Sequence, residues 1–410
     1  MTPFLQLALA MSIIVLAAKA GGYISYRLGQ PSVLGELLMG VLLGPSVLDI
    51  LHISYFAESH VGEMVHQLAE IGVLLLMFLA GLDLHLTELY RSGKVALLAG
   101  VLGVVFPTML GVATGLGFSL GLISAIFLGL ILSATSVSIS AQTLMELKVL
   151  RSRVGIGLLG AAVFDDILVV LGLSLFTAIA QPGSAGGLAS VSIILLRMVG
   201  YLVGASLLGF WLLPRLSKWV DELPISQGVI AFTVATILLY GWLAEVLGQV
   251  AAITGAFLAG LCLARSPLKE RIEHGISTLA YSLFVPIFFV NIGLSVNIGS
   301  MGAESLWLFL TMVLVAVVGK VLGAGWGATL GGLSRREALQ LGVGMVSRGE
   351  VGLIVASVGI AQGLISESVF SGVVGMVVVT TLITPLLLRR LFVKAETKQA
   401  IVEIAQGEER

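Results

Sequence analysis

The segment Ala161-Ala-Val-Phe-Asp165-Asp166-Ile-Leu-Val-Val170 places two adjacent carboxylates near the middle of a long apolar run. An ionisable side chain at bilayer depth costs about 2.5 to 3.5 kcal/mol on insertion scales, so it usually faces the protein interior and marks a pathway. Successive residues of a helix point about 100° apart, so the two carboxylates can serve different environments. One can meet a cation from a neighbouring helix while the other faces a water-filled cavity. A purely structural ion-pair cluster is the alternative interpretation.

The composition of the whole chain is that of a protein embedded in a lipid bilayer. Of 410 residues, 58% are hydrophobic and 11% are charged, against roughly 25% charged in an ordinary soluble domain. The mean hydropathy of +1.09 and the 51 glycines are typical of a polytopic membrane protein whose helices approach closely. A net charge of -1 gives no electrostatic footprint for nucleic acid, so no nucleic-acid partner is expected.

Apolar runs of about 20 residues, the length that crosses about 30 Å of hydrocarbon, recur along the whole chain. They predict an all-α protein with thirteen transmembrane helices, at residues 4–28, 31–50, 63–85, 94–118, 120–146, 151–180, 188–213, 225–243, 246–265, 276–296, 303–330, 335–361 and 366–393. Lys and Arg gather in alternate connections and after the last helix. Because cytoplasmic loops collect basic residues, this alternation predicts an N-terminus outside and a C-terminus in the cytoplasm.

The two halves of the chain contain similar short segments. Gly35-Glu-Leu-Leu-Met-Gly40 resembles Gly255-Ala-Phe-Leu-Ala-Gly260, and Ala80-Gly-Leu-Asp-Leu84 resembles Ile292-Gly-Leu-Ser-Val296. Six helices, one linker helix and six more helices put the halves in opposite orientations, which is the inverted repeat of secondary transporters. The predicted parts are a first repeat at 1–180, a linker helix at 188–213, a second repeat at 225–393 and a polar cytoplasmic tail at 394–410.

Basic residues inside apolar helices need an acidic partner or a route to the interface. Lys320 lies mid-span in Val317-Val-Gly-Lys320-Val-Leu-Gly-Ala-Gly-Trp-Gly327, among glycines that allow close backbone approach, so it is the expected partner of one aspartate. A lysine that snorkels to the interface is the alternative. Lys19 is expected to pair with Glu36, and the sequence assigns no role to Glu70 or Arg197.

Two further segments predict interrupted helices. Ser133-Ala-Thr135-Ser136-Val-Ser138-Ile-Ser140 holds five hydroxyls in eight residues, and such side chains compete for backbone hydrogen bonds. Gly342-Val-Gly-Met-Val-Ser347-Arg348-Gly349-Glu350-Val-Gly352 carries opposite charges two positions apart, which cannot pair on one face of a regular helix. Freed carbonyls and hydroxyls would be ligands for a hard cation, while Arg348 and Glu350 would neutralise the dipole ends of the half-helices. Serines that only pack, and interhelical pairing without a break, are the alternatives.

Taken in order, these segments resemble one family. The resemblance is to the monovalent cation:proton antiporter-2 family, and within it to the bacterial NapA-type and GerN-type sodium/proton antiporters. The segments that match this family are Gly160-Ala-Ala-Val-Phe-Asp165-Asp166, Ala134-Thr-Ser136, Gly319-Lys320, Ser347-Arg-Gly-Glu-Val-Gly-Leu353 and Gln30-Pro-Ser-Val-Leu-Gly-Glu-Leu37. Kef-type potassium/proton relatives usually have Gln-Asp in place of Asp-Asp, so this sequence favours the electrogenic sodium branch.

The resemblance implies a fold like that of NapA and NhaA, in which the two discontinuous helices cross. It implies a homodimer, with a core domain at about 94–180 and 303–393 beside a dimerisation domain at about 1–85 and 225–296. By position, Asp166 is similar to the aspartate that binds the transported cation or its competing proton. Asp165 is similar to the aspartate that forms a salt bridge with Lys320, and Thr135 and Ser136 fall where the unwound segment approaches the ion.

The predicted function is secondary active exchange of a monovalent cation, Na⁺, for protons across the bacterial cytoplasmic membrane. K⁺ or Li⁺ is the alternative cargo on the same scaffold, and neither a cofactor nor an enzymatic activity is expected. The adjacent aspartates do not suit an intramembrane aspartyl protease, whose aspartates face each other from separate helices. A membrane-depth histidine for a serine protease is also missing, since the five histidines lie in or near loops. A membrane sensor or channel with a structural charge cluster is the remaining alternative.

Overall fold

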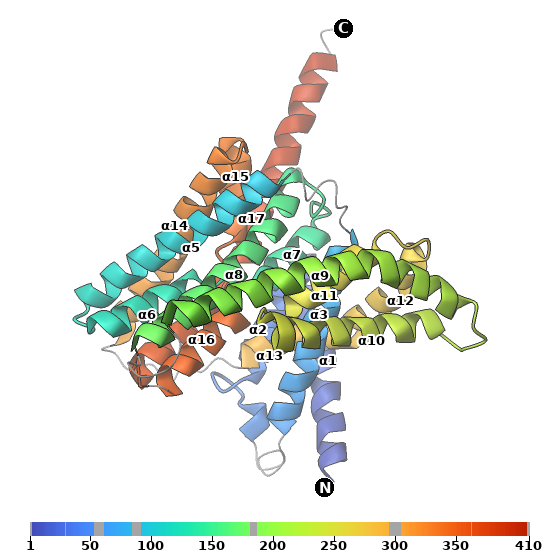
Figure 1. Ribbon diagram of the computed structural model, residues 1–410, viewed down its shortest axis with the longest axis horizontal. Helices are drawn as coiled ribbons and strands as arrows, with labels where there is room; N and C mark the ends of the chain where they lie inside the picture. Colours follow the sequence, from blue (N-terminus) through green and yellow to red (C-terminus); the bar gives the residue numbers. More distant parts are fainter. Residues whose placement is uncertain are drawn as a thin grey trace.

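The computed structural model describes residues 2–28, 30–52, 61–83, 92–180, 187–294, 305–361 and 363–407. Within these ranges every regular element is a helix. In the same ranges ten helices are long and apolar enough to cross a membrane, and two shorter apolar helices accompany them. The chain is therefore an all-helical, multi-pass membrane protein, as its composition predicts. Its two ends lie at opposite ends of the molecule (Figure 1).

The helices run in the following order along the described chain. They are α1 (Pro3–Arg27), α2 (Ser32–Leu43), η1 (Ile50–His52), α3 (Val61–Asp83), α5 (Gly93–Gly117), α6 (Leu122–Ser133), α7 (Val137–Glu146), α8 (Arg153–Ala180), α9 (Gly187–Asp221), α10 (Gly228–Leu243), η2 (Ala244–Gly248), α11 (Ala252–Leu263), α12 (Lys269–Leu279), η3 (Ala280–Phe284), α13 (Val285–Leu294), α14 (Ser305–Leu330), α15 (Arg335–Gly344), α16 (Glu350–Ala361) and α17 (Glu367–Gly407).

Three predicted boundaries differ from the structure. The run at 31–50 is helical only to Leu43, because Gly44 ends α2 and Pro45 lacks the N–H that a continuing helix needs. The run at 276–296 belongs to a longer helical stretch that starts at Lys269. Charged residues on the exposed face of its first turns lower the average hydropathy there, although Ile272 is buried. Residues 394–407 of the predicted polar tail continue α17 as helix.

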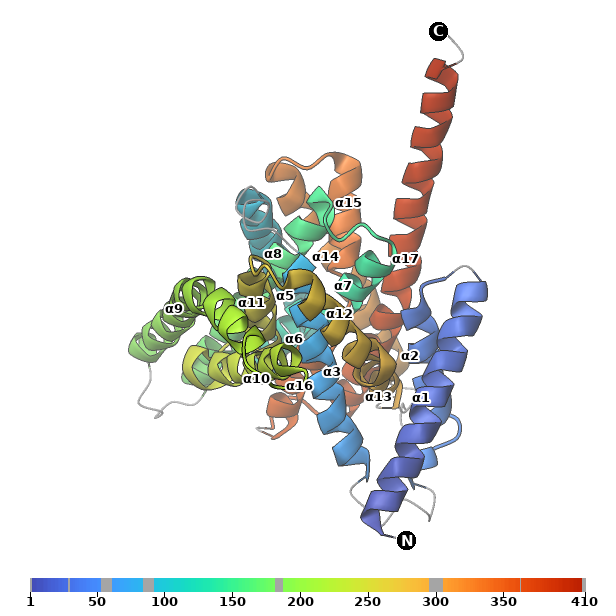
Figure 2. The same ribbon diagram turned by 90° about the vertical axis from the view of Figure 1, so that its right-hand side faces the viewer.

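The helices pack in two groups, which we name after their central pairs. In the α5–α14 group, α5 packs on α6, α8 and α14, and α14 also packs on α15 and α17. In the α3–α11 group, α3 packs on α11 and α13, α11 packs on α10, and α2 packs on α1 and α13. The long helix α9 packs on α8 of one group and on α11 of the other. It passes in front of both groups in Figure 1 and lies on the side away from α1 and α17 in Figure 2.

Glycines on α14 set the distance between α14 and α5. A Cβ atom on Gly323 would lie 2.4 Å from the carbonyl oxygen of Leu102, and one on Gly327 would lie 2.2 Å from that of Leu98. Small residues at this four-residue spacing let two backbones touch, as in other transmembrane helix pairs. The close contact fixes Lys320, one turn before Gly323, at the centre of the α5–α14 group.

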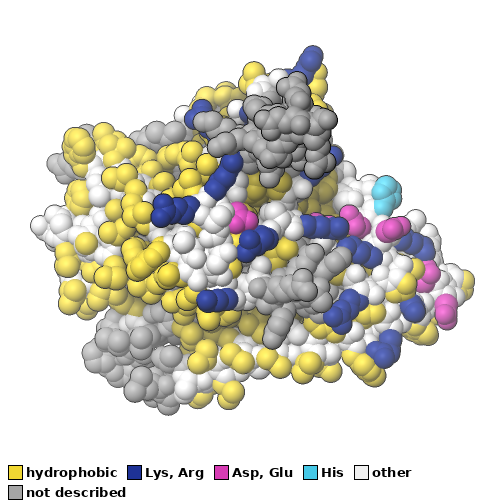
Figure 3. Space-filling view, turned by 90° about the horizontal axis from the view of Figure 1, so that it is seen from above, with side chains coloured by type: hydrophobic (Ala, Val, Ile, Leu, Met, Phe, Trp, Pro, Cys, Tyr) yellow, Lys and Arg dark blue, Asp and Glu magenta, His cyan; other side chains and the backbone are white. Residues whose placement is uncertain are grey.

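Basic side chains gather at one end of the molecule. Figure 3 views the end at which α15 and the C-terminal helix lie, and Lys and Arg side chains are spread across it. Arg151 and Arg153, in the connection before and at the start of α8, are more than half exposed. This is the end that the distribution of basic loops predicts to face the cytoplasm.

Candidate functional site

Helix α8 carries both carboxylates into the protein interior. The hydroxyl of Ser152 caps its first turn by accepting a hydrogen bond from the N–H of Gly155 at 3.2 Å. The helix then runs without a break through the acidic pair. Asp165 is fully buried and Asp166 is 7% exposed. Because bulk water reaches neither carboxylate freely, both depend on partners from the protein or from a bound ion.

Asp165 forms an ion pair with Lys320. The Nζ atom of Lys320 donates to Oδ1 of Asp165, and both side chains are fully buried. Among the described residues, Oδ2 of Asp165 has no hydrogen-bond partner. The structure therefore brings together two of the residues singled out from the sequence, and it leaves one carboxylate oxygen of the pair free to accept a further hydrogen bond.

The two segments predicted as interruptions face each other. Helix α6 ends at Ser133 and α7 begins at Val137, while α15 ends at Gly344 and α16 begins at Glu350. Between them, the N–H of Ser136 donates to the carbonyl of Ser347 at 2.8 Å. This bond satisfies backbone groups that the breaks have released from their helices, which a membrane interior requires.

A close approach where the two interruptions meet depends on a glycine. A Cβ atom on Gly349 would lie 2.6 Å from both the Cβ and the Oγ atoms of Ser136. Hydroxyls of α17 complete the arrangement, because Thr381 donates to the carbonyl of Arg348 at 2.7 Å and Thr380 accepts from the N–H of Arg348 at 3.3 Å. The second interruption is thus held by α7 from one side and by α17 from the other.

Arg348 lies in the second interruption and is fully buried. Its guanidinium donates to the carbonyl of Met345, just after α15, at 3.1 Å and to the carbonyl of Ala316, on α14, at 3.1 Å. A cation on the last carbonyls of a helix offsets the negative end of the helix dipole. Glu350 begins α16, and its side chain lies outside the described residues.

Asp166 lies on a narrow cavity between the two helix groups. The cavity is about 10 Å³ in volume, enough for about one water molecule. Its lining comprises Met77, Val137, Leu159, Ala162, Val163, Asp166, Ile253, Thr254 and Phe257. Thr254 of α11, which is 6% exposed, donates its hydroxyl hydrogen to Oδ2 of Asp166 at 3.3 Å.

The sequence did not single out Thr254. Its only signal is a hydroxyl residue in the apolar run 246–265, and many such residues simply bond to their own helix. Asp166, whose carboxylate it contacts, is 88 positions away in the chain. The pairing of Thr254 with Asp166 is therefore visible only once α11 packs near α8.

Thr135 and Ser136 lie in the first interruption, where both are buried. The hydroxyl of Thr135 lies 3.5 Å from the carbonyl oxygen of Ser133. Neither residue lines the cavity at Asp166, but their neighbour Val137 does. This segment thus lies next to the cavity, but Thr135 and Ser136 do not form part of its wall.

The weaker sequence features have separate positions. Lys19 lies 3.9 Å from Glu36 and donates to the carbonyl of Tyr281 at 2.7 Å. Glu70 is two-thirds exposed and lies 3.6 Å from the ring of His66. Arg197 is exposed on α9.

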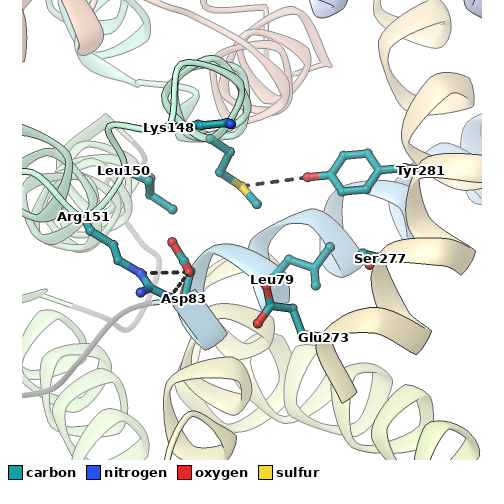
Figure 4. Close-up of a pocket in the computed structure, with 9 residues that line it drawn as sticks. Leu79, Asp83, Lys148, Leu150, Arg151, Glu273, Ser277 and Tyr281 are labelled. Carbon is teal, nitrogen blue, oxygen red and sulfur yellow. Dashed lines mark hydrogen bonds and ion pairs between the residues drawn. The ribbon is translucent and has the colours of Figure 1, made fainter. Parts of the chain in front are cut away.

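A larger hollow of about 320 Å³, here called the vestibule, opens at the basic end of the molecule. Its lining comprises Leu79, Asp83, Met145, Lys148, Leu150, Arg151, Glu273, Ser277 and Tyr281 (Figure 4). Arg151 pairs with Asp83 across it. The vestibule therefore lies between the α7–α8 connection on one side and α3 and α12 on the other.

Comparison with known proteins gives a consistent result. Residues 12–394 match the family described as "Sodium/hydrogen exchanger, transmembrane". The chain is 37% identical to the Na(+)/H(+)-K(+) antiporter GerN of Bacillus cereus, over 95% of this chain and 96% of that protein. It is 37% identical to the Na(+)/H(+) antiporter of Enterococcus hirae, over 92% of this chain and 96% of that protein. The fold resembles the solved sodium proton antiporter MjNhaP1 from Methanocaldococcus jannaschii, with a TM-score of 0.67 at 18% identity, over 94% and 96% of the two chains.

Proposed function

Because this chain belongs to the sodium/hydrogen exchanger family, we propose that it is a secondary active antiporter that exchanges Na⁺ for protons across a membrane. One observation carries the proposal. Asp166 is a nearly buried carboxylate on a cavity of about one water molecule in size. In so small a space the carboxylate holds either a proton or a dehydrated cation.

The proposed cycle follows from this exclusion. Protons and Na⁺ compete for Asp166, and either occupant neutralises the carboxylate enough for the site to pass to the other side of the membrane. Thr135 and Ser136 supply further oxygens from the first interruption, and Arg348 and Glu350 compensate the ends of the half-helices. Lys320 exchanges a proton through its pair with Asp165, so more protons than cations cross per cycle and the exchange is electrogenic.

We assign the movement to the two helix groups. The core domain, about 94–180 and 303–393, corresponds to the α5–α14 group, and the dimerisation domain, about 1–85 and 225–296, corresponds to the α3–α11 group. The segregation of packing between these groups supports the assignment. Thirteen spans in an inverted repeat, a homodimer, an outside N-terminus and a location in the bacterial cytoplasmic membrane belong to the same proposal.

Potassium is the second candidate for the transported cation. One similar relative is a Na(+)/H(+)-K(+) antiporter, and both ions would bind the same carboxylate. The two ions differ in size, so the rigidity and number of the oxygen ligands around Asp166 decide between them. The transport assay must therefore compare cations directly.

The test is transport by the purified full chain in proteoliposomes. A pH gradient is imposed across the vesicle membrane, and Na⁺, Li⁺, K⁺ or Rb⁺ is added on one side. A pH-sensitive dye inside the vesicles reports the change in internal pH. We expect the wild-type chain to dissipate the gradient with Na⁺, and the Asp166→Asn variant to lose this response. Glu222→Gln, which removes an exposed carboxylate after α9, is the matched control and should behave as wild type. Sodium-driven exchange by Asp166→Asn at the wild-type rate would refute the site assignment.

A further inference from the structure

We propose that Thr254 is a side-chain ligand of the transported cation, supplied from α11, and that it sets the preference of the site for Na⁺ over larger alkali ions. This inference rests on the proposed antiport at Asp166. It adds a residue that lies outside the two interrupted helices and outside the helix that carries the aspartates. Four observations about the cavity and its surroundings support it.

The first observation is the composition of the cavity. Apart from Asp166 and Thr254, the described side chains that line it are apolar, among them Met77, Ile253 and Phe257. A cation that enters this space sheds water and needs oxygen atoms in exchange. Within the described lining, the hydroxyl of Thr254 is the side-chain oxygen nearest at hand after the carboxylate itself.

The second observation is that the hydroxyl of Thr254 is directed away from its own helix. Many threonines of the described helices, such as Thr233 and Thr236 of α10, donate to the carbonyl four residues earlier. For Thr254 that position is Val250, which precedes the start of α11 at Ala252. The hydroxyl instead donates to Oδ2 of Asp166 at 3.3 Å.

The third observation is chemical. A hydroxyl group carries one hydrogen to donate and two lone pairs, and it rotates to suit its partner. When Asp166 is ionised and no cation is bound, Thr254 donates to the carboxylate. When Asp166 is protonated, Thr254 accepts from the carboxylic acid, and when Na⁺ is bound, a lone pair of Oγ1 turns toward the ion. In the arrangement of the two helix groups seen here, one side chain therefore has a partner whether the site is empty, protonated or occupied by Na⁺.

The fourth observation concerns the helix groups to which Asp166 and Thr254 belong. Asp166 stands on α8, which packs in the α5–α14 group, whereas Thr254 stands on α11, which packs against α3 and α10. The ligand therefore reaches the site from the other group. Because Thr254 and Asp166 are almost fully buried around a space of about one water molecule, the separation of the two oxygens limits the size of the ion between them.

Three variants test the proposal in the proteoliposome assay. Thr254→Val keeps the shape of the side chain and removes the hydroxyl, and Thr254→Ser keeps the hydroxyl. Thr236→Val makes the same chemical change at a buried threonine of α10 whose hydroxyl bonds to its own helix. We expect Thr254→Val to raise the KM for Na⁺ about tenfold, the effect of losing one oxygen partner of a charged group. Its maximal rate should change little, and its preference for Na⁺ over K⁺ should fall.

Thr254→Ser and Thr236→Val should keep the wild-type KM. A second readout avoids transport altogether: Na⁺ should raise the thermal unfolding midpoint of the purified wild-type chain and of Thr254→Ser, and should raise that of Thr254→Val much less at the same concentration. An unchanged KM and ion preference in Thr254→Val, or an equal loss in Thr254→Ser, would overturn the assignment of Thr254. If the wild-type chain exchanges no alkali cation for protons, the proposed antiport itself fails instead.

Discussion

Asp165 and Lys320 form an ion pair from which water is excluded on all sides. Removal of both charges from water costs several kcal/mol per ion, and only their mutual attraction and hydrogen bond offset that cost. A pair of this kind is an expensive way to join two helices. In the proposed cycle Lys320 loses a proton, and Asp165, which is adjacent to Asp166, then loses its charged partner.

The first prediction concerns charge movement. Lys320→Gln keeps a hydrogen-bond donor toward Asp165 but carries no exchangeable proton, so we expect the exchange that remains to lose its dependence on membrane voltage. Currents from proteoliposomes on a solid-supported membrane measure this directly. Lys218→Gln, at an exposed lysine near the end of α9, should keep the wild-type current. A wild-type current in Lys320→Gln would remove Lys320 from the proton pathway.

The second prediction concerns stability. Lys320→Met alone leaves a buried carboxylate without its cation and should destabilise the folded chain by about 3 to 5 kcal/mol. When Asp165→Asn is added, the double variant should regain a large part of that loss. The thermal unfolding midpoint of detergent-purified protein measures both effects. If the two substitutions lower the midpoint additively, the two side chains are not energetically coupled.

The two interrupted helices could be predicted from the sequence alone. The hydroxyls from Ser133 to Ser140 and the glycines around Arg348 predicted interruptions in the two places where α6–α7 and α15–α16 are broken. These signals are local, because hydroxyl side chains compete for the backbone hydrogen bonds of their own helix. The contact between Ser136 and Ser347 and the role of α17 hydroxyls depend on packing, and no local pattern encodes them.

Other parts of the site could not be predicted from the sequence, for a related reason. Asp166 stood out because a carboxylate is costly in an apolar run, whereas Thr254 is an ordinary residue there. Likewise, a hydropathy window shortened the helical stretch that starts at Lys269, because charges on its exposed face lower the average. Features that are energetically unfavourable in isolation were visible, and features that become meaningful through a distant neighbour were not.

The third prediction tests the contact between the two interruptions. Gly349→Ala places a methyl group 2.6 Å from the side chain of Ser136, which should destabilise the chain by about 1 to 3 kcal/mol and reduce exchange. Gly352→Ala is the matched control, because a Cβ atom there meets no neighbour within 4 Å among the residues that the structure describes. Thermal unfolding and proteoliposome exchange are measured for both variants. Equal effects at the two glycines would show that the close approach at Gly349 is not needed.

Across the whole molecule, polar contacts join the two helix groups at the basic end. Arg151 pairs with Asp83 of α3. Helix α7 packs on α8 and α17 of the α5–α14 group, and its Glu146 accepts from the N–H of Ser32 at 2.8 Å and from the Ser32 hydroxyl at 2.5 Å. Alternating access in this fold requires one group to move past the other. These contacts must therefore break in each cycle if the α5–α14 group is the moving body.

The fourth prediction tests that movement. In a Cys262→Ala background, Ser32→Cys with Glu146→Cys is linked by a short, reducible bifunctional thiol reagent. The link should stop exchange, and reduction should restore it. A link between Lys19→Cys and Glu36→Cys, both in the α3–α11 group, should leave exchange intact. Continued exchange by the first linked pair would contradict a relative movement of the two groups.

The claim on which the account depends is that Asp166 binds either a proton or Na⁺, and never both. It is tested most directly by the protons released when Na⁺ is added to the purified chain in weakly buffered detergent solution, near the pH at which the site is half protonated. We predict that Na⁺ releases protons from the wild-type chain and that Asp166→Asn releases none under the same conditions. Sodium binding to the wild-type chain without proton release would contradict the account.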